Sequence, residues 1–250
     1  ISYLSNRYQR IPISQATAGI PLGGTIQNYS GGNLTNVVLT AAIFEVTDTL
    51  NPVATLSSAP INLASGHSAN VNCGSWNSAY TSSKSFVIKY TKTQAQTDAN
   101  SANDVATQAL ILDYNYYARD DNNFQTAYNW SSTNFSWKQG NVFNFLGAGS
   151  VTGVSYYLAS NSTTQTYTVQ VFTVLNGIPS ANPIYTSQVL TANGAGWKTL
   201  TFNTPLVIST GAHYLFAISH SGTSGFPLGV SNATATSGKS LVKVGNNGWN

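Results

Sequence analysis

Apolar and polar residues alternate with a period of two along nearly the whole chain, which is the pattern of half-buried β-strands. The apolar, β-branched stretch 36–47 (NVVLTAAIFEVT) is long enough for a central strand, and Val37, Leu39 and Ile43 share one of its faces. Further strands are predicted in the first half at 24–28, 53–58, 68–73, 85–91 and 107–117. About seven short strands separated by Gly, Pro and Asn turns indicate an immunoglobulin-like β-sandwich.

The character of the chain changes after residue 117. Residues 118–123 (ARDDNN) form its most charged stretch, and a second series of period-two segments follows. These strands are predicted at 142–145, 151–158, 165–174, 184–190, 197–202, 213–219 and 241–244. The second series resembles a jelly-roll sandwich. The predicted fold class is therefore all-β, with two consecutive β-sandwich domains, an immunoglobulin-like one over 1–116 and a jelly-roll-like one over 117–250.

Two segments do not follow the strand pattern. The stretch 94–104 is polar on all faces, so it is predicted as a loop or a single helical turn. Trp249 follows a Gly-containing turn, and its ring is expected to pack on the sandwich because an exposed indole is unfavourable. The chain contains no Met, so we expect a section of a longer polypeptide, in which a further segment or a neighbouring subunit covers the sandwich edge.

The composition narrows the class of protein. Charged residues make up only 7% of the chain, compared with about 25% in an average soluble domain. A surface built from Asn, Ser, Thr, Gln and Tyr is common in extracellular β-rich proteins. The ten basic residues are scattered, so the net charge of +3 offers no stripe for a nucleic acid. No apolar run approaches the roughly 20 residues of a membrane span.

Cysteine usage agrees with this class. The chain has one cysteine, Cys73, so no disulfide can form within it. Secreted eukaryotic modules of this size often carry disulfides, whereas a bacterial surface protein can rely on its sandwich cores. Cys73 is predicted to be a small buried apolar residue, because no nearby base would activate its thiol.

Several short motifs resemble a known group of proteins. They are YQRIP at 8–12, LDY at 112–114, YARDD at 117–121, NGIP at 176–179 and GAHY at 211–214. Their order is similar to that in the middle modules of large bacterial surface and secreted proteins exported by the type IX secretion system. The resemblance implies an immunoglobulin-like module followed by a jelly-roll-like one, displayed outside the cell. It implies no single activity.

The sequence offers little for catalysis. Of the seven acidic residues, only Asp113, Asp120 and Asp121 lie close together in the chain, and they fall at the predicted domain junction rather than as two facing carboxylates. His213 and His220 do not have the spacing of zinc ligands. The chain is therefore predicted not to be an enzyme.

The junction does suggest a metal site. Asp113, Asp120 and Asp121, followed by two asparagines, bring together the oxygen ligands that Ca²⁺ prefers. Calcium bound there would stiffen the linker. The alternative is a solvated turn in which Arg119 neutralises its acidic neighbours.

Aromatic residues suggest a ligand site. Tyr128, Trp130 and Trp137 lie close in sequence and are predicted to stack on sugar rings, with core packing between the two sandwiches as the alternative. Trp76 and Trp197 are predicted to be core or rim residues rather than sugar platforms.

Two functions follow from these observations. The first is a non-catalytic structural or adhesive module of an extracellular bacterial cell-surface protein, in a stalk, filament or adhesin, with neighbouring modules or subunits as partners. The second is a carbohydrate-binding module attached to a secreted enzyme, with glycans as ligands. The ligand and the length of the parent protein do not follow from the sequence.

Overall fold

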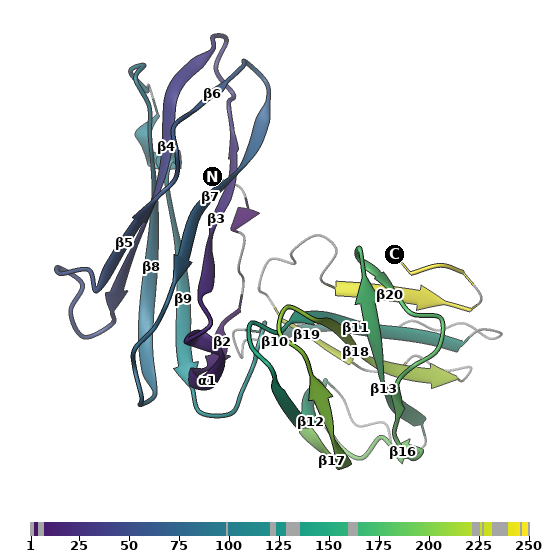
Figure 1. Cartoon of the computed structure of the whole chain (residues 1–250). Coiled ribbons are helices and arrows are strands. Elements are labelled where there is room, and N and C mark those ends of the chain that lie inside the picture. Colours follow the sequence, from purple (N-terminus) through teal and green to yellow (C-terminus); the bar gives the residue numbers. More distant parts are fainter. Residues whose placement is uncertain are drawn as a thin grey trace. The chain divides into compact units, whose positions relative to one another are not determined.

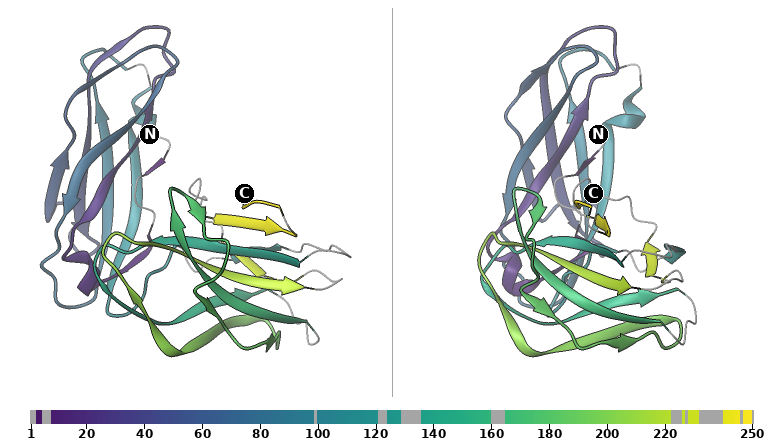
Figure 2. Two further views of the ribbon diagram at one scale, coloured as in Figure 1. Left: turned by 45° about the vertical axis from the view of Figure 1, so that its right-hand side comes forward. Right: turned by 90° about the vertical axis from the view of Figure 1, so that its right-hand side faces the viewer.

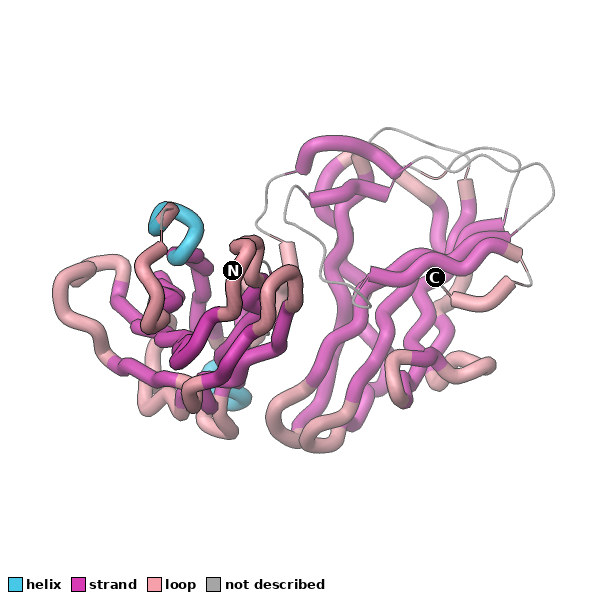
Figure 3. The backbone as a smooth tube through the Cα atoms, turned by 90° about the horizontal axis from the view of Figure 1, so that it is seen from above, coloured by secondary structure: helices cyan, strands magenta, loops and turns pink. Residues whose placement is uncertain are grey.

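The computed structural model describes residues 3–4, 8–98, 100–120, 124–128, 136–159, 165–221, 226, 228–231, 240–245 and 247–249. Strands dominate these residues, and helix within them is confined to the four-residue segments α1 (Ile13–Ala16) and η1 (Ser101–Asp104) (Figure 3). The all-β prediction is confirmed. The segment η1 is the single turn predicted within 94–104. The chain divides into two units, 1–119 and 120–250, whereas the sequence placed the boundary between residues 116 and 117.

The first unit is a sandwich of two sheets (Figure 1). One sheet holds, in order, β1 (Tyr3–Leu4), β3 (Ile20–Gln27) and β7 (Ser68–Trp76). The other holds, in order, β2 (Arg10–Pro12), β9 (Val105–Asp113), β8 (Lys84–Thr93), β4 (Leu34–Glu45) and β5 (Ala54–Ser57), with β6 (Ile61–Leu63) also paired to β4. The orders β1–β3–β7 and β9–β8–β4 correspond to strands A–B–E and G–F–C of an immunoglobulin sandwich.

Alternation along the central strands builds the core of this unit. In β4 the predicted inner face is confirmed, because Val37, Leu39 and Ile43 are fully buried. Phe86, Ile88 and Tyr90 point inward from β8 in the same way. Successive inward residues on neighbouring antiparallel strands meet side by side, so the two sheets close on a continuous apolar layer.

The second unit also has two sheets (Figure 2). One runs in the order β10 (Phe124–Tyr128), β19 (Leu228–Ser231), β12 (Gly149–Leu158) and β17 (Gly196–Ile208). The other runs in the order β14 (Ile178–Pro179), β13 (Thr166–Leu175), β18 (His213–Ser221), β11 (Ser136–Asn144) and β20 (Ser240–Val244), and β15 (Tyr185–Thr186) and β16 (Leu190–Thr191) also pair with β13.

The strand order of this unit is that of a jelly roll. If β14, β15 and β16 count as one interrupted strand, the two sheets run 1-8-3-6 and 2-7-4-5 in order of appearance, with β20 added beside the second strand. Apart from β13 and the short strands that directly follow it, sheet neighbours therefore come from distant parts of the chain, as two interleaved Greek keys require. This arrangement brings β10, β12 and β17 into one sheet.

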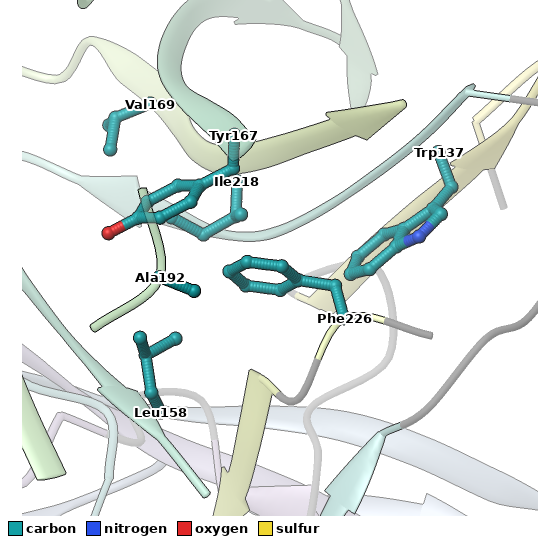
Figure 4. Close-up of a cluster of buried hydrophobic side chains, with 7 residues drawn as sticks. All are labelled: Trp137, Leu158, Tyr167, Val169, Ala192, Ile218 and Phe226. Carbon is teal, nitrogen blue, oxygen red and sulfur yellow. The ribbon is translucent and has the colours of Figure 1, made fainter. Parts of the chain in front are cut away.

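Two apolar clusters lie on opposite faces of the larger sheet. The cluster between the sheets contains Trp137, Leu158, Tyr167, Val169, Ala192, Ile218 and Phe226 (Figure 4). The other contains Val142, Phe172, Val174, Leu215, Ala217 and Leu241. Trp249 packs on the second cluster, with its ring centroid 5.4 Å from that of Phe172. The packing predicted for Trp249 is confirmed.

Candidate functional site

Three aromatic side chains meet on the smaller sheet of the second unit, and we call them the aromatic platform: Phe124 of β10, Tyr157 of β12 and Trp197 of β17. Phe124 and Tyr157 are stacked, with ring centroids 3.8 Å apart and planes 7° from parallel. Trp197 stands at 74° to Phe124 and at 81° to Tyr157, with centroid distances of 5.2 and 5.8 Å. The three rings form a corner in which an indole meets a stacked pair nearly at right angles.

The platform lies on the outer face of the sheet. Tyr156 and Leu158 contact the core cluster, so Tyr157 between them must point the other way. On β17, Leu200 contacts the same core, and Trp197 is three residues away on the opposite face. Trp197 accordingly remains 45% exposed, whereas Trp137 on the core-facing side of the larger sheet is only 3% exposed.

Backbone pairing holds the corner in place. Tyr157 is directly opposite Trp197 in the β12–β17 ladder, where cross-strand side chains are in contact. Phe124 reaches Tyr157 across β19, the strand between β10 and β12. Gly229 of β19 makes this contact possible, because a Cβ added there would lie only 2.6 Å from Cδ1 of Tyr157.

Hydroxyl groups lie next to the rings on the same face. Ser155 and Thr199 form the neighbouring outward pair of the ladder, and their Oγ and Oγ1 atoms are 2.9 Å apart. Both side chains are exposed. The negative face of an aromatic ring attracts C–H groups that carry partial positive charge, and hydroxyls can donate or accept hydrogen bonds. An open indole beside neutral hydroxyls is therefore suited to a sugar ring.

The aromatic site predicted from sequence does not form as expected. Trp137 is only 3% exposed and lies in the core cluster, with its ring centroid 6.0 Å from that of Phe226 (Figure 4). A sugar cannot reach a buried indole, so the ligand role predicted for Trp137 is wrong. Tyr128 ends β10, but its side chain lies outside the described part of the chain, as does Trp130 altogether.

The platform itself was missed by sequence reasoning. The prediction that Trp76 lies in the core is confirmed, since it is 7% exposed. Trp197, which is 45% exposed, does not lie in the core, so of the predicted core or rim positions only the rim fits it. The available signal was the period-two pattern of β17, because Leu200 and Phe202 on the inner face leave Trp197 on the other.

The predicted calcium ligands are spread over both units. Asp113 belongs to the first unit, where its Oδ2 is 3.1 Å from Nη1 of Arg10 and its Oδ1 accepts a hydrogen bond from the backbone of Asn115 at 3.0 Å. Asp120 belongs to the second unit, and Asp121 lies outside the described residues. Calcium binding at the junction therefore stays a prediction.

Arg119 contacts an aromatic ring of the first unit. Its guanidinium carbon lies 4.2 Å from the centre of the Tyr8 ring, in a cation–π contact, and neutralisation of its acidic neighbours stays a prediction. Burial lowers the pKa of Arg119 from its ordinary value, although the group remains charged. Asp113 is paired instead with Arg10, which lies on the neighbouring strand β2.

Two further observations concern the described residues as a whole. Within the described ranges, no three side chains of His, Cys, Asp or Glu form a group that could hold a metal ion. No helix in this part of the chain is long and apolar enough to cross a membrane.

Comparisons with known proteins give little further information. No family model matches the chain, and no curated protein matches it. The chain is similar to the crystal structure of the cysteine protease and lectin-like domains of Cwp84, a surface layer associated protein of Clostridium difficile. The sequences are 13% identical, the TM-score is 0.39, and the match covers 86% of this chain and 54% of that chain. The chain thus spans about half of that protein's structure, and the family suggested by the sequence motifs stays a prediction.

Proposed function

We propose that the chain is a non-catalytic binding section of an extracellular bacterial surface protein, and that its second unit holds a glycan on the aromatic platform. The observation that carries the proposal is the 45% exposure of Trp197, which is held in place by Tyr157 and Phe124. A tryptophan costs free energy when it is left in water, so a fixed, outward indole is more useful as a binding surface than as packing.

The ligand class follows from the neighbours of the platform. Ser155 and Thr199 are uncharged and offer hydroxyls beside the rings. Lys198, which alternates with Trp197 along β17, donates a hydrogen bond to the backbone oxygen of Asn193. We therefore propose a neutral hexose rather than a sialic or uronic acid, whose carboxylate would need a positive partner at the site.

Glycan binding fits the adhesin version of the first function suggested by the sequence and the carbohydrate-binding module of the second. An adhesin section and a binding module attached to a secreted enzyme would both use the platform in the same way. The two versions differ in what the neighbouring module is: a further surface module in the adhesin, and a catalytic module in the secreted enzyme. The low content of charged residues supports an extracellular setting for either version. The first unit, a sandwich with its own core, is suited to act as a spacer in both.

A glycan array with purified protein tests the proposal. We expect saturable binding to neutral glycans, and we expect Trp197→Ala to weaken it at least 10-fold, since truncating an aromatic anchor often costs about 2 kcal/mol. Tyr29→Ala is the matched control, because Tyr29 is 79% exposed but belongs to the first unit. Equal binding by the Trp197→Ala and wild-type proteins, or no binding to any neutral glycan, would overturn the proposal.

A further inference from the structure

A lysine stands at one end of the inner face of β8. Phe86, Ile88 and Tyr90 point into the first sandwich, and Lys92 continues the same alternation. The ladder pairs Tyr90 with Ala106 and Thr91 with Val105, so its continuation places Lys92 opposite Asp104. The side chains of Lys92 and Asp104 are only 9% and 14% exposed. An amine and a carboxyl group thus meet at the edge of an apolar core.

The contacts of the Lys92 amine are unequal. Its Nζ donates hydrogen bonds to Oε1 of Gln94 and to Oδ2 of Asp98, each at 2.9 Å. Nζ also lies 2.6 Å from Oδ1 of Asp104, but the angles of this contact are not those of a hydrogen bond. The Asp104 carboxyl group is therefore in contact with the nitrogen without being held by a hydrogen bond from it.

Asp98 lies next to the Lys92 amine, and its own hydrogen bonds hold the pKa of its carboxyl group below the ordinary value. Its Oδ1 accepts a hydrogen bond from the backbone of Asn100 at 2.8 Å, and its Oδ2 accepts one from Lys92. The Asp98 carboxyl group also interacts with that of Asp104. A nucleophilic amine, a carboxyl group in contact with it and a second carboxyl group beside both are the three components that amide formation between side chains requires.

We propose that Lys92 and Asp104 join through an intramolecular amide bond, with Asp98 as the group that moves the protons. The Lys92 ammonium gives a proton to Asp98, and the freed nitrogen attacks Cγ of Asp104. Asp98 returns that proton and a second one from nitrogen to the departing oxygen. The new C–N bond replaces a C–O bond, and one water molecule leaves. One ammonium and one carboxylate give one amide and one water, so no further reactant is needed.

The ion pair is the starting state of this step. Burial lowers the pKa of Lys92, but the adjacent carboxyl groups of Asp104 and Asp98 outweigh it and raise the pKa above its ordinary value. The amine is thus protonated at first, which is why an adjacent proton acceptor is required. The product removes two charges from a poorly solvated place, where an ion pair carries a desolvation penalty.

A link at this position would do the work of a disulfide. It would join β8 to the start of β9 and close the loop between them, which reduces the entropy of the unfolded chain. The chain has only Cys73, and its thiol is buried in the same unit. An amide link needs no cysteine, so the lack of a second cysteine in this sequence does not prevent it.

The same unit contains a matched control pair. Nζ of Lys84 is 2.9 Å from Oε2 of Glu45, a similar distance, but the lysine side chain is 40% exposed. The other oxygen of Glu45 accepts a hydrogen bond from the Tyr80 hydroxyl rather than facing a second carboxyl group. We expect this pair to remain ionic.

Mass spectrometry of the purified, denatured chain tests the proposal. The wild-type mass should be lower than the sequence mass by one water molecule. Trypsin should cleave after Lys84, Lys89 and Arg119 but not after Lys92, and so release a peptide of residues 90–119 that lacks one water. The full sequence mass together with cleavage after Lys92, or a lost water located outside residues 90–119, would overturn the proposal. Neither reading depends on glycan binding.

Three variants assign the roles. Lys92→Arg and Asp98→Ala should restore the full mass, since the first keeps the charge without the reactive amine and the second removes the proton carrier. Asp104→Asn should lose ammonia in place of water, because the leaving group is then an amide nitrogen. A crosslink that persists in Asp98→Ala would rule out the role of Asp98, and one that persists in Lys92→Arg would rule out Lys92 as the nucleophile. The mass of the wild-type protein decides whether the amide bond forms. This result does not depend on whether any of the variants folds.

Discussion

Tyr157 and Trp197 occupy directly opposite positions in the β12–β17 ladder, and their ring planes meet at 81° with centroids 5.8 Å apart. Both rings belong to the outer face of a jelly-roll sheet whose inner face builds the core. Sheet pairing therefore fixes the corner of the aromatic platform before any ligand arrives. A preformed site of this kind loses little conformational entropy on binding.

Gly229 is predicted to control the shape of the platform. A Cβ at this position would lie 2.6 Å from Cδ1 and 3.2 Å from the backbone oxygen of Tyr157, so Gly229→Ala must displace the Tyr157 ring and separate it from Phe124. We expect glycan affinity to fall several-fold while the unit remains folded. Titration calorimetry with a glycan bound by the wild type measures the loss. Unchanged affinity would mean that the stacked pair does not contribute to binding.

Trp137 is predicted to affect stability and not binding. Its indole is buried against Phe226, and Nε1 has no hydrogen-bond partner in the described part of the unit, so Trp137→Phe removes packing alone. A loss of about 1–2 kcal/mol of unfolding free energy is expected from the smaller side chain. Urea denaturation measures this value, and glycan affinity measured well below the melting temperature should equal that of the wild type. Loss of affinity without loss of stability would return Trp137 to the ligand site.

Gly140 is predicted to be required for the larger sheet of the second unit. It lies in β11 between β18 and β20, and an added Cβ would be 2.0 Å from the backbone oxygen of Phe216. Because the obstacle is backbone, Gly140→Ala should destabilise the unit by about 3 kcal/mol or more. Gly31→Ala is the control, since nothing lies within 4 Å of a Cβ there. Thermal unfolding of the two variants should differ clearly, and equal melting temperatures would contradict the close approach of β11 and β18.

Tyr80 gives a pH-dependent prediction for the first unit. Its hydroxyl donates a hydrogen bond to Oε1 of Glu45 at 2.6 Å, and this bond raises the pKa of Tyr80 to about 12. An unfolded tyrosine has a pKa of about 10, so the folded state binds this proton more tightly. The resulting stabilisation is complete below about pH 10 and is lost as the pH rises toward 12.

The matched variant isolates this effect. Tyr80→Phe removes the titrating group, so the wild type should exceed it in unfolding free energy at about pH 9 and lose part of that advantage by about pH 11. Urea denaturation at the two pH values provides the comparison, in which the other tyrosines contribute to both proteins. A difference that does not change with pH would mean that the hydrogen bond to Glu45 does not hold the Tyr80 proton.

The sequence predicted the sandwiches because alternation is a local property. The buried face of β4, with Val37, Leu39 and Ile43, can be identified from any ten residues around it. Packing of Trp249 followed from the cost of exposing an indole. In each case the relevant physics depends on neighbours in the chain.

The site could not be predicted in this way. Phe124, Tyr157 and Trp197 are distant in sequence and meet only because the jelly-roll order places β10, β12 and β17 in one sheet. The aromatic prediction assumed that residues close in sequence form one site. Trp137, however, lies on a different sheet from the platform and faces the core. For Lys92 the pattern alone shows a charged residue at an inward position of β8. It does not show that Asp98 and Asp104 are its partners.

Nuclear magnetic resonance of the indole N–H groups tests the glycan-binding proposal most directly. The chain has five tryptophans, and Trp→Phe variants assign their signals. On titration with a neutral glycan from the array, the Trp197 signal should shift in a saturable way, because its ring is 45% exposed, while the signal of Trp137, 3% exposed, should stay in place. A saturable shift at another tryptophan with none at Trp197, or no shift at any of the five, would contradict the assignment of the aromatic platform as the binding site.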